Sequence, residues 1–212
     1  MNPENTTPRN VAILIFDDME TLDFAGPREV FTLASEQNQP SPFHVYEVGL
    51  TAAPILARGR LRVTPSHGID DCPDPDILIV PGGYGTRHLK QNEGLLKWIA
   101  AQAARVELLM SVCTGSLVLA KAGLLAGKRA TTHHSAFGRL AVLSPTTTVV
   151  RDERFVESSD RIMTAGGISA GIDLSLFVVE KLLGEKARAA VEDEMEYGWF
   201  FNPKKLGSSD RG

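Results

Sequence analysis

Short apolar runs alternate along this chain with longer segments whose apolar residues recur at helical spacing. A buried strand of a parallel sheet contains such a run of about four to eight apolar residues, and a covering helix has one apolar stripe. The alternation therefore predicts an α/β fold with a mostly parallel sheet and helices on both faces. Strands are expected at residues 11–16, 43–50, 77–80, 106–112 and 129–132, in two or three pieces within 147–163, and in a hairpin that includes 61–63.

The helices are predicted from the same pattern and from the residues that begin them. Pro27 fits the first turn of a helix that residues 28–35 continue, because proline is tolerated there. A second helix is expected after residue 85, and its buried face consists of Leu89, Leu95, Leu96 and Ile99. A third is expected after residue 114, with Leu117, Ala120 and Leu124 on one face. Two more are expected at residues 172–183, which we interpret as core, and at the charged residues 186–197.

Length and composition indicate one domain. With 212 residues, 43% of them hydrophobic, the chain is large enough for a continuous core and requires no second domain. We expect an N-terminus that is disordered or extended over residues 1–10, a single domain over 11–201 and a polar tail over 202–212. The aromatic cluster at 199–201 is expected to cover the core or to contact another subunit.

Charge and cysteine content exclude several classes of protein. The formal net charge is −4 without a large basic patch, so no nucleic-acid partner is expected, and the polar tail has no room for a helix-turn-helix region. Residues 1–10 contain no signal peptide or membrane anchor, so we expect a cytoplasmic protein without a membrane partner. Two cysteines are too few for a disulfide framework.

Cys113 lies where the apolar run 106–112 ends and the small residues 114–116 begin a helix. A strand that turns directly into a helix holds its corner residue in a strained conformation, with the first helical amides directed at the side chain. Those amides and the helix dipole favour an anion, and they lower the pKa of a thiol from ~8.5 into the range of about 3.5 to 7.5. We interpret Cys113 as a nucleophile at a strand-to-helix elbow rather than as a buried core cysteine.

Three polar or glycine-rich segments directly follow predicted strands, at residues 17–23, 81–85 and 113–116. Ligands of parallel α/β sheets bind outside the carboxyl ends of the strands, so we expect these segments to converge on one site. The amides of Gly83 and Thr114 are predicted to form an oxyanion hole there. A phosphate loop is not expected, because no Gly-Lys-Ser/Thr sequence follows the glycines.

Five motifs together resemble the ThiJ/PfpI superfamily, whose domain is flavodoxin-like and similar to class I glutamine amidotransferases. The resemblance extends over residues 11–184, and it is greatest to the isocyanide hydratase branch and to the ligand-sensing halves of AraC-type regulators, which share the Cys-Thr-Gly elbow. The motifs are residues 22–27 (LDFAGP), 79–83 (IVPGG), 111–116 (SVCTGS), 130–133 (ATTH) and 166–173 (GGISAGID).

Two departures from the superfamily pattern narrow the chemistry that the resemblance implies. Peptidase and chaperone members have histidine directly after the nucleophile, where this chain has Thr114. No histidine follows His134, so the triad of a glutamine amidotransferase is incomplete. Neither peptidase activity nor glutamine hydrolysis is expected.

The resemblance offers two carboxyl groups as partners of the thiol. Many superfamily members have a glutamate at the position of Glu20 that hydrogen-bonds the cysteine sulfur, whereas the hydratase branch has an aspartate that matches Asp23. A carboxyl group buried beside a thiol has a raised pKa and holds a proton for delivery. We favour Asp23 as the proton donor, with Glu20 as the second candidate.

The remaining candidate residues concern the substrate. By resemblance, His133 follows the strand next to the elbow and faces the cysteine, where it orients a water or the substrate; a purely structural histidine is the alternative. Gly83, Tyr84 and Thr114 are expected to contact the substrate, Thr114 through its hydroxyl. The adjacent His133 and His134 lack a third ligand at a usual spacing, so no metal is predicted, and no cofactor is expected.

The leading functional hypothesis that the resemblance implies is the hydration of an isocyanide to an N-formamide through a covalent thioimidate on Cys113. A thiol-dependent reaction on a reactive carbonyl, such as a 2-oxoaldehyde, is the second hypothesis. A non-catalytic ligand or redox sensor is the third. In each case the partner is a small molecule, and the resemblance implies a homodimer.

Overall fold

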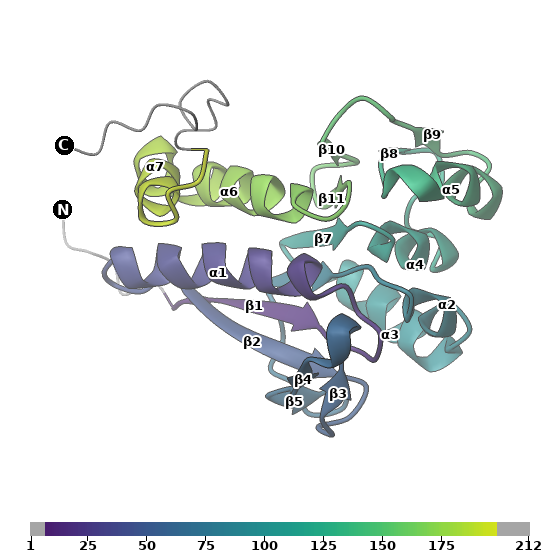
Figure 1. Cartoon of the computed structure of the whole chain (residues 1–212), viewed down its shortest axis with the longest axis horizontal. Coiled ribbons are helices and arrows are strands. Elements are labelled where there is room, and N and C mark those ends of the chain that lie inside the picture. The colour runs from purple at the N-terminus through teal and green to yellow at the C-terminus, as the bar shows by residue number, and fades with distance from the viewer. Residues whose placement is uncertain (1–6, 199–212) are drawn as a thin grey trace, which may run out of the picture.

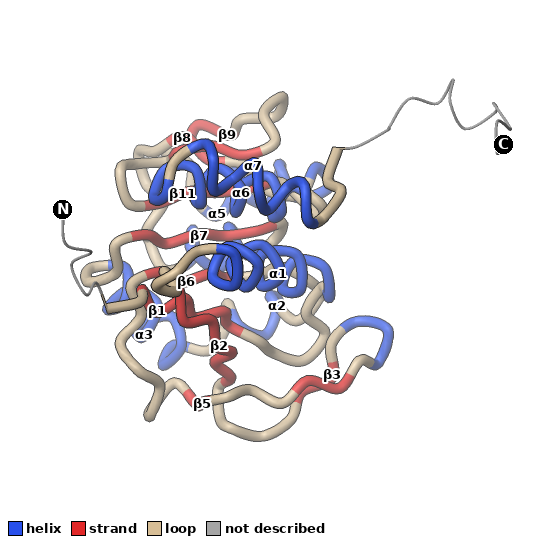
Figure 2. Tube along the Cα trace, turned by 90° about the vertical axis from the view of Figure 1, so that its left-hand side faces the viewer, coloured by secondary structure: helices blue, strands red, loops and turns tan. Residues whose placement is uncertain are grey.

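The computed structural model describes residues 7–198, and its centre is a seven-stranded sheet (Figure 1). Neighbouring strands are parallel except for the antiparallel pair at one edge. Figure 2 shows the strands one above another, with β11 near the top and β5 at the bottom. The order is β10 (Phe155–Glu157), β11 (Ile162–Ala165), β7 (Leu108–Val112), β6 (Ile77–Val80), β1 (Arg9–Leu14), β2 (Phe43–Gly49) and β5 (His67–Gly68).

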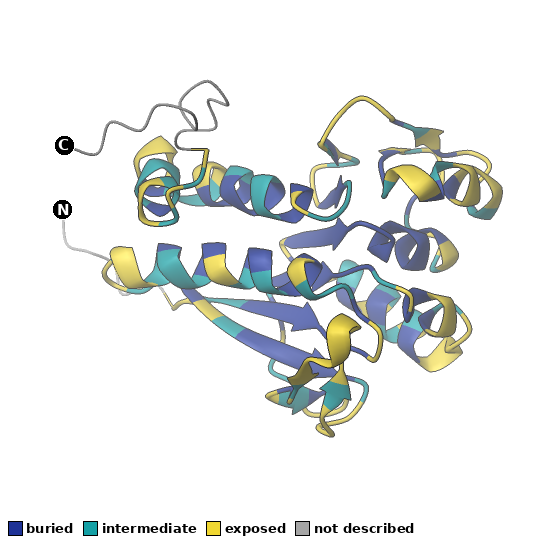
Figure 3. Cartoon of the chain, viewed as in Figure 1, coloured by how far each residue is buried: buried dark blue, intermediate teal, exposed yellow. Residues whose placement is uncertain are grey.

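The central strands are buried on both faces (Figure 3). Every residue of β6, β7 and β11 is buried. Since successive side chains of a strand point to opposite faces, other elements must cover both faces of the sheet. The predicted α/β fold with a mostly parallel sheet is confirmed, and β6 has the predicted bounds. β1 begins at Arg9, two residues before the predicted start of the first strand, and Arg9 pairs with Phe43 of β2.

The helices form two groups. α1 (Thr21–Gln37), α6 (Ala170–Leu183) and α7 (Glu185–Glu194) pack against one another (Figure 1). In the second group, α4 (Gly115–Lys121) contacts α2 (Thr86–Leu89), α3 (Glu93–Ala103) and α5 (Phe137–Leu143). Shorter elements are the antiparallel pair β3 (Ile55–Leu56) and β4 (Arg62–Val63), the parallel pair β8 (Arg129–Ala130) and β9 (Thr148–Val149), and 3-10 turns at Arg58–Arg60 and His134–Ala136.

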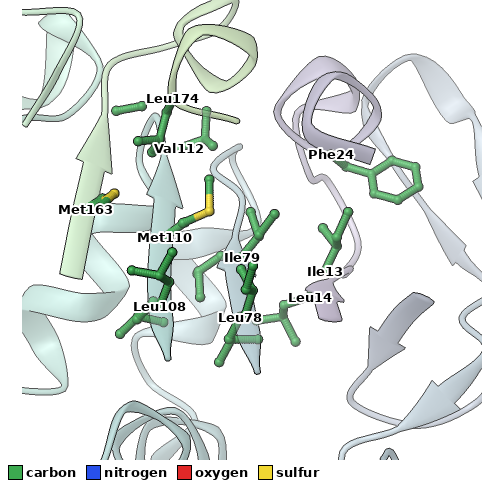
Figure 4. Packing of buried hydrophobic residues seen from close by; sticks show 14 of the residues in the cluster. Ile13, Leu14, Phe24, Leu78, Ile79, Leu108, Met110, Val112, Met163 and Leu174 are labelled. Atoms are coloured by element: carbon green, nitrogen blue, oxygen red, sulfur yellow. The ribbon is translucent and has the colours of Figure 1, made fainter. Parts of the chain in front are cut away.

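The core lies where the side chains of β1, β6, β7 and β11 meet α1 and α6. Figure 4 shows Leu174 of α6 next to Val112 of β7, and Phe24 of α1 belongs to the same buried cluster. Burying one large apolar side chain contributes roughly 1.5–3 kcal/mol, so this cluster holds the carboxyl ends of the strands in register. The labelled strand residues are Ile13, Leu14, Leu78, Ile79, Leu108, Met110, Val112 and Met163.

α1 begins earlier than predicted. It starts at Thr21, so Pro27 lies inside the helix and not in its first turn. Phe24 and Pro27 are buried, and a Cβ on Gly26 would lie 2.8 Å from Ile172 Cγ1 of α6. The stabilisation from the close packing of α1 on α6 therefore outweighs the loss of the backbone hydrogen bond that a proline cannot donate. As a result, Asp23 lies in the first helical turn and not in a loop.

The strand before His133 is β8, which belongs to a separate two-stranded sheet, and Thr132, which follows this strand, donates a hydrogen bond to the Cys113 carbonyl oxygen at the elbow. The aromatic cluster 199–201 and the polar tail 202–212 lie outside the described residues. Within residues 7–198, no helix is long and apolar enough to cross a membrane.

Candidate active site

The turn between β7 and α4 holds Cys113 in the predicted strained conformation. Its φ of 55° lies in the left-handed region, which costs a residue other than glycine about 1–3 kcal/mol. The Cys113 amide donates to the carbonyl oxygens of Ala165 and Gly166, at 3.1 and 2.9 Å. Its own carbonyl oxygen accepts hydrogen bonds from the hydroxyls of Thr132 and Ser116, at 2.9 and 3.2 Å. These four bonds hold the corner in place.

Two glycines allow the elbow to pack directly on the end of β6. A Cβ on Gly115 would lie 2.0 Å from the carbonyl oxygen of Val80. A Cβ on Gly82 would lie 2.5 Å from the Thr114 amide nitrogen and 2.8 Å from both Asp23 Oδ2 and Cys113 Cβ. The three predicted segments therefore converge at the carboxyl ends of β1, β6 and β7, as expected.

Asp23 is fully buried against the thiol. The Gly82 amide donates to Asp23 Oδ2 at 3.0 Å, and Oδ1 has no N–H or O–H partner among residues 7–198. Burial raises the pKa of Asp23 to about 7, although the Gly82 amide and the Cys113 thiol oppose this rise as hydrogen-bond donors. Asp23 therefore exchanges its proton close to neutral pH, which is the property that a proton donor requires.

The predicted lowering of the Cys113 pKa is wrong. Cys113 is only 6% exposed. Burial, followed by the charge of Asp23, raises the pKa of the thiol to about 12, while the amide and hydroxyl of Thr114 act in the opposite direction. The Thr114 amide, at the start of α4, does reach the thiol, but loss of hydration and the adjacent carboxylate outweigh it. The resting group is a thiol that is hydrogen-bonded to Asp23.

Thr114 and Gly83 bond to each other rather than forming the predicted oxyanion hole. The Gly83 amide donates to Thr114 Oγ1 at 3.0 Å, and Thr114 Oγ1 lies 3.2 Å from the Gly83 carbonyl oxygen. The hydroxyl of Thr86 also donates to the Gly83 carbonyl oxygen, at 2.8 Å. The Gly83 amide is thus occupied, and within residues 7–198 the Thr114 amide is the one backbone donor to the sulfur.

Glu20 faces Arg58 instead of the thiol. The Glu20 carboxylate forms an ion pair with the Arg58 guanidinium. Its charge contributes to the raised pKa of Asp23, after burial. Of the two predicted carboxyl groups, Asp23 is the one that shares a hydrogen bond with the Cys113 thiol.

His133 lies beside the thiol as a neutral imidazole. Burial lowers its pKa most, and His134 and Arg139 lower it further. Nδ1 accepts a hydrogen bond from the Ser135 amide at 3.3 Å and lies 2.8 Å from Ser135 Oγ. Because Nδ1 accepts, the ring proton is on Nε2. His133 therefore has both the structural role considered for it and a position next to the nucleophile.

These residues surround a pocket of about 120 Å³. All predicted site residues except Asp23 line it, and Tyr84 stands at its rim with 61% of its surface exposed. No group of three His, Cys, Asp or Glu side chains within residues 7–198 is arranged to hold a metal ion. The lining residues that were predicted are Glu20, Gly83, Tyr84, Cys113, Thr114 and His133.

Sequence reasoning missed the arginines of this pocket. Arg58, Arg87 and Arg139 line it from a 3-10 turn, α2 and α5, three elements that are far apart in the sequence. No local motif marks any of them, because each reaches the pocket through tertiary packing alone. The local signals of the sequence identify the elbow and the glycine loop, but not the charge around them.

A substitution at Gly167 tests the arrangement of His133 and Cys113. A Cβ on Gly167 would lie 2.6 Å from His133 Cδ2 and 2.8 Å from Cys113 Sγ, so alanine must displace one of them. We expect Gly167→Ala to slow the alkylation of Cys113 by iodoacetamide about 10-fold or more, measured by mass spectrometry of the Cys113 peptide. Gly138→Ala is the control, because no atom lies within 4 Å of its Cβ position. An unchanged rate in a folded Gly167→Ala protein would contradict this geometry.

A nucleophile elbow with a buried carboxylic acid against its thiol, on a mostly parallel sheet, defines a cysteine-centred α/β protein. The chain belongs to the DJ-1/PfpI family, which matches residues 9–181. This confirms the predicted resemblance.

Three relatives illustrate the family. An isonitrile hydratase of Pseudomonas putida is 37% identical over 190 residues, which cover 88% of this chain and 78% of that protein. An HTH-type transcriptional regulator of Pseudomonas aeruginosa is 27% identical over 195 residues, but this chain spans about half of its length (52%). A solved ThiJ/PfpI family protein from Pseudomonas syringae superposes with a TM-score of 0.80 at 28% identity, covering 91% of this chain and 76% of that one.

Proposed function

We propose that this chain is a cysteine-dependent hydratase that converts an isocyanide into an N-formamide. The observation that carries the proposal is the contact between the Asp23 carboxyl group and the Cys113 thiol. The terminal carbon of an isocyanide must accept both the nucleophile and a proton, so the acid and the thiol have to meet at one atom. The similarity to the isonitrile hydratase of Pseudomonas putida supports the same reaction.

The first step forms the thioimidate. The thiol proton passes to the Asp23 carboxylate as the sulfur bonds to the isocyanide carbon, and Asp23 then transfers that proton to the same carbon. The product is Cys113–S–CH=N–R, in which every atom of thiol and isocyanide is retained. Asp23 suits this shuttle because its pKa, raised by burial to about 7, lies between those of a carboxylic acid in water and the thiol.

The second step releases the formamide. A water adds to the thioimidate carbon, and one of its protons moves to nitrogen. The remaining hydroxyl proton returns through Asp23 to the sulfur as the C–S bond breaks and the formyl C=O forms. The Thr114 amide stabilises the departing thiolate, and we assign to the neutral His133 the orientation of the attacking water.

The pH dependence tests this proposal. The Asp23–Cys113 pair must hold one proton, because a protonated Asp23 cannot accept the proton of the thiol. Since the pKa of Asp23 is raised to about 7, kcat/KM for a neutral alkyl isocyanide should rise with pH to a plateau, with a midpoint near that value. The formyl proton of the product, followed by NMR from about pH 5 to 9, measures the rate.

Methylglyoxal serves as the comparison substrate, because the carbonyl-directed hypothesis predicts its turnover. Absence of formamide at every pH, or turnover of methylglyoxal that exceeds that of the isocyanide, would contradict the proposal. A rate that falls as the pH rises through 7 would contradict the proton shuttle.

A further inference from the structure

The proposed reaction gives no role to the arginines of the pocket. Arg58 is neutralised by its ion pair with Glu20. Arg87 and Arg139 are exposed and form no ion pair with a carboxylate of residues 7–198. With His133 neutral, the lining side chains therefore carry two uncompensated positive charges.

The positive charges of Arg87 and Arg139 both affect the pKa of the same neighbouring residue. After burial, the charges of Arg139 and Arg87 contribute most to the lowered pKa of Lys90, the residue that follows α2. Arg139 also contributes to the lowered pKa of His133, inside the pocket. These cations repel other cations from the entrance, so an anion there is favoured.

Tyr84 holds one of these arginines at the rim. The Arg87 guanidinium carbon lies 5.3 Å from the centroid of the Tyr84 ring, and that of Arg58 lies 5.9 Å from it. Stacking on an aromatic ring orients a guanidinium without neutralising its charge. Arg87 is therefore held at the rim while its N–H groups remain available to a ligand.

We propose that the substrate is a small isocyanide that carries a carboxylate, with the carboxylate bound between Arg87 and Arg139 and the isocyanide carbon at Cys113. Guanidinium groups bind carboxylates through paired, charge-assisted hydrogen bonds. A cavity of about 120 Å³ accommodates a molecule of only a few non-hydrogen atoms. The reacting group in this inference rests on the proposed function; the preference for an anion does not.

A matched pair of substrates tests the specificity. Isocyanoacetate and its methyl ester have the same reacting group, and only the acid is charged. Wild-type protein should give a higher kcat/KM for the acid, and Arg87→Gln and Arg139→Gln should each lower the acid-to-ester ratio by about 3- to 10-fold. Arg62→Gln is the control, because Arg62 is exposed on β4 and does not line the pocket.

A second measurement is independent of isocyanide chemistry. Iodoacetate and iodoacetamide alkylate the same thiol and differ in charge, so the ratio of their rates at Cys113 reports the local potential even if the thiol pKa changes. In the wild-type protein, the ratio of the iodoacetate rate to the iodoacetamide rate at Cys113 should be higher than the same ratio for free cysteine. Arg87→Gln and Arg139→Gln should each lower the ratio of the iodoacetate rate to the iodoacetamide rate, whereas Arg62→Gln should leave this ratio unchanged.

The two measurements separate the possible failures. If neither isocyanide is hydrated, the proposed function is wrong, and the alkylation ratio still decides whether the pocket prefers anions. If both isocyanides are hydrated but the acid has no advantage, and iodoacetate shows no preference for Cys113 over free cysteine, the inference is overturned and the hydratase proposal stands.

Discussion

Replacing Cys113 by serine is expected to lower kcat/KM for isocyanide hydration by about 10⁴-fold or more. A serine hydroxyl is far less acidic than a thiol, so Asp23, with a pKa of about 7, cannot take its proton while the bond to carbon forms. Serine is close to cysteine in size, and the four hydrogen bonds at the corner are made by its backbone. The thermal unfolding midpoint should therefore change little, and the rate of formamide formation measures the loss.

Cys72→Ser is the matched control. Cys72 is half-buried, and its sulfur lies 3.9 Å from the carbonyl oxygen of Ile69, outside the pocket. Its replacement should leave kcat/KM within about twofold of wild type. Retained hydration by Cys113→Ser, or its loss in Cys72→Ser, would contradict the assignment of the nucleophile.

Replacing Asp23 by asparagine should slow isocyanide turnover but speed up the alkylation of Cys113. The change keeps the size of the side chain but removes the acid, so isocyanide turnover should fall by about 10²- to 10⁴-fold. The carboxylate is also a cause of the raised pKa of Cys113, so its removal should lower that pKa. Alkylation of Cys113 by iodoacetamide near pH 8 should then become several-fold faster, up to about 10-fold.

Glu20→Gln is the comparison for this result. Glu20 is paired with Arg58 and is not packed on the thiol, so turnover should fall much less. If Asp23 had only a structural role, Asp23→Asn would slow both isocyanide turnover and the alkylation of Cys113. If Glu20→Gln abolished turnover while Asp23→Asn retained it, the carbonyl-directed hypothesis would replace the hydratase proposal.

The elbow could be predicted because its signals are local. An apolar run that ends at Cys113, followed by small residues, specifies a strand that turns into a helix, and the glycines after β6 mark the loop that packs on it. The same reasoning predicts where the segment that contains Asp23 lies, because it follows β1. The sequence does not reveal that α1 already includes Asp23, since packing against α6 decides where that helix begins.

The electrostatics of the site could not be predicted in the same way. The prediction of a lowered thiol pKa considered only the helix amides, whereas burial and Asp23 are tertiary effects and outweigh them. The predicted oxyanion hole failed because the Thr114 hydroxyl bonds to the Gly83 amide across the loop. Arg87 and Arg139 come from separate helices, and only the folded chain brings their charges to one pocket.

The most direct test of the central claim is the mass of the protein during turnover. Wild-type protein is mixed with excess isocyanide, quenched in acid within the first turnover, and examined as intact protein and as peptides. A covalent thioimidate predicts an added mass equal to that of the whole isocyanide, located on the Cys113 peptide, because attack and proton transfer lose no atom. Formamide production without any adduct at Cys113, or with the adduct on Cys72, would contradict the account.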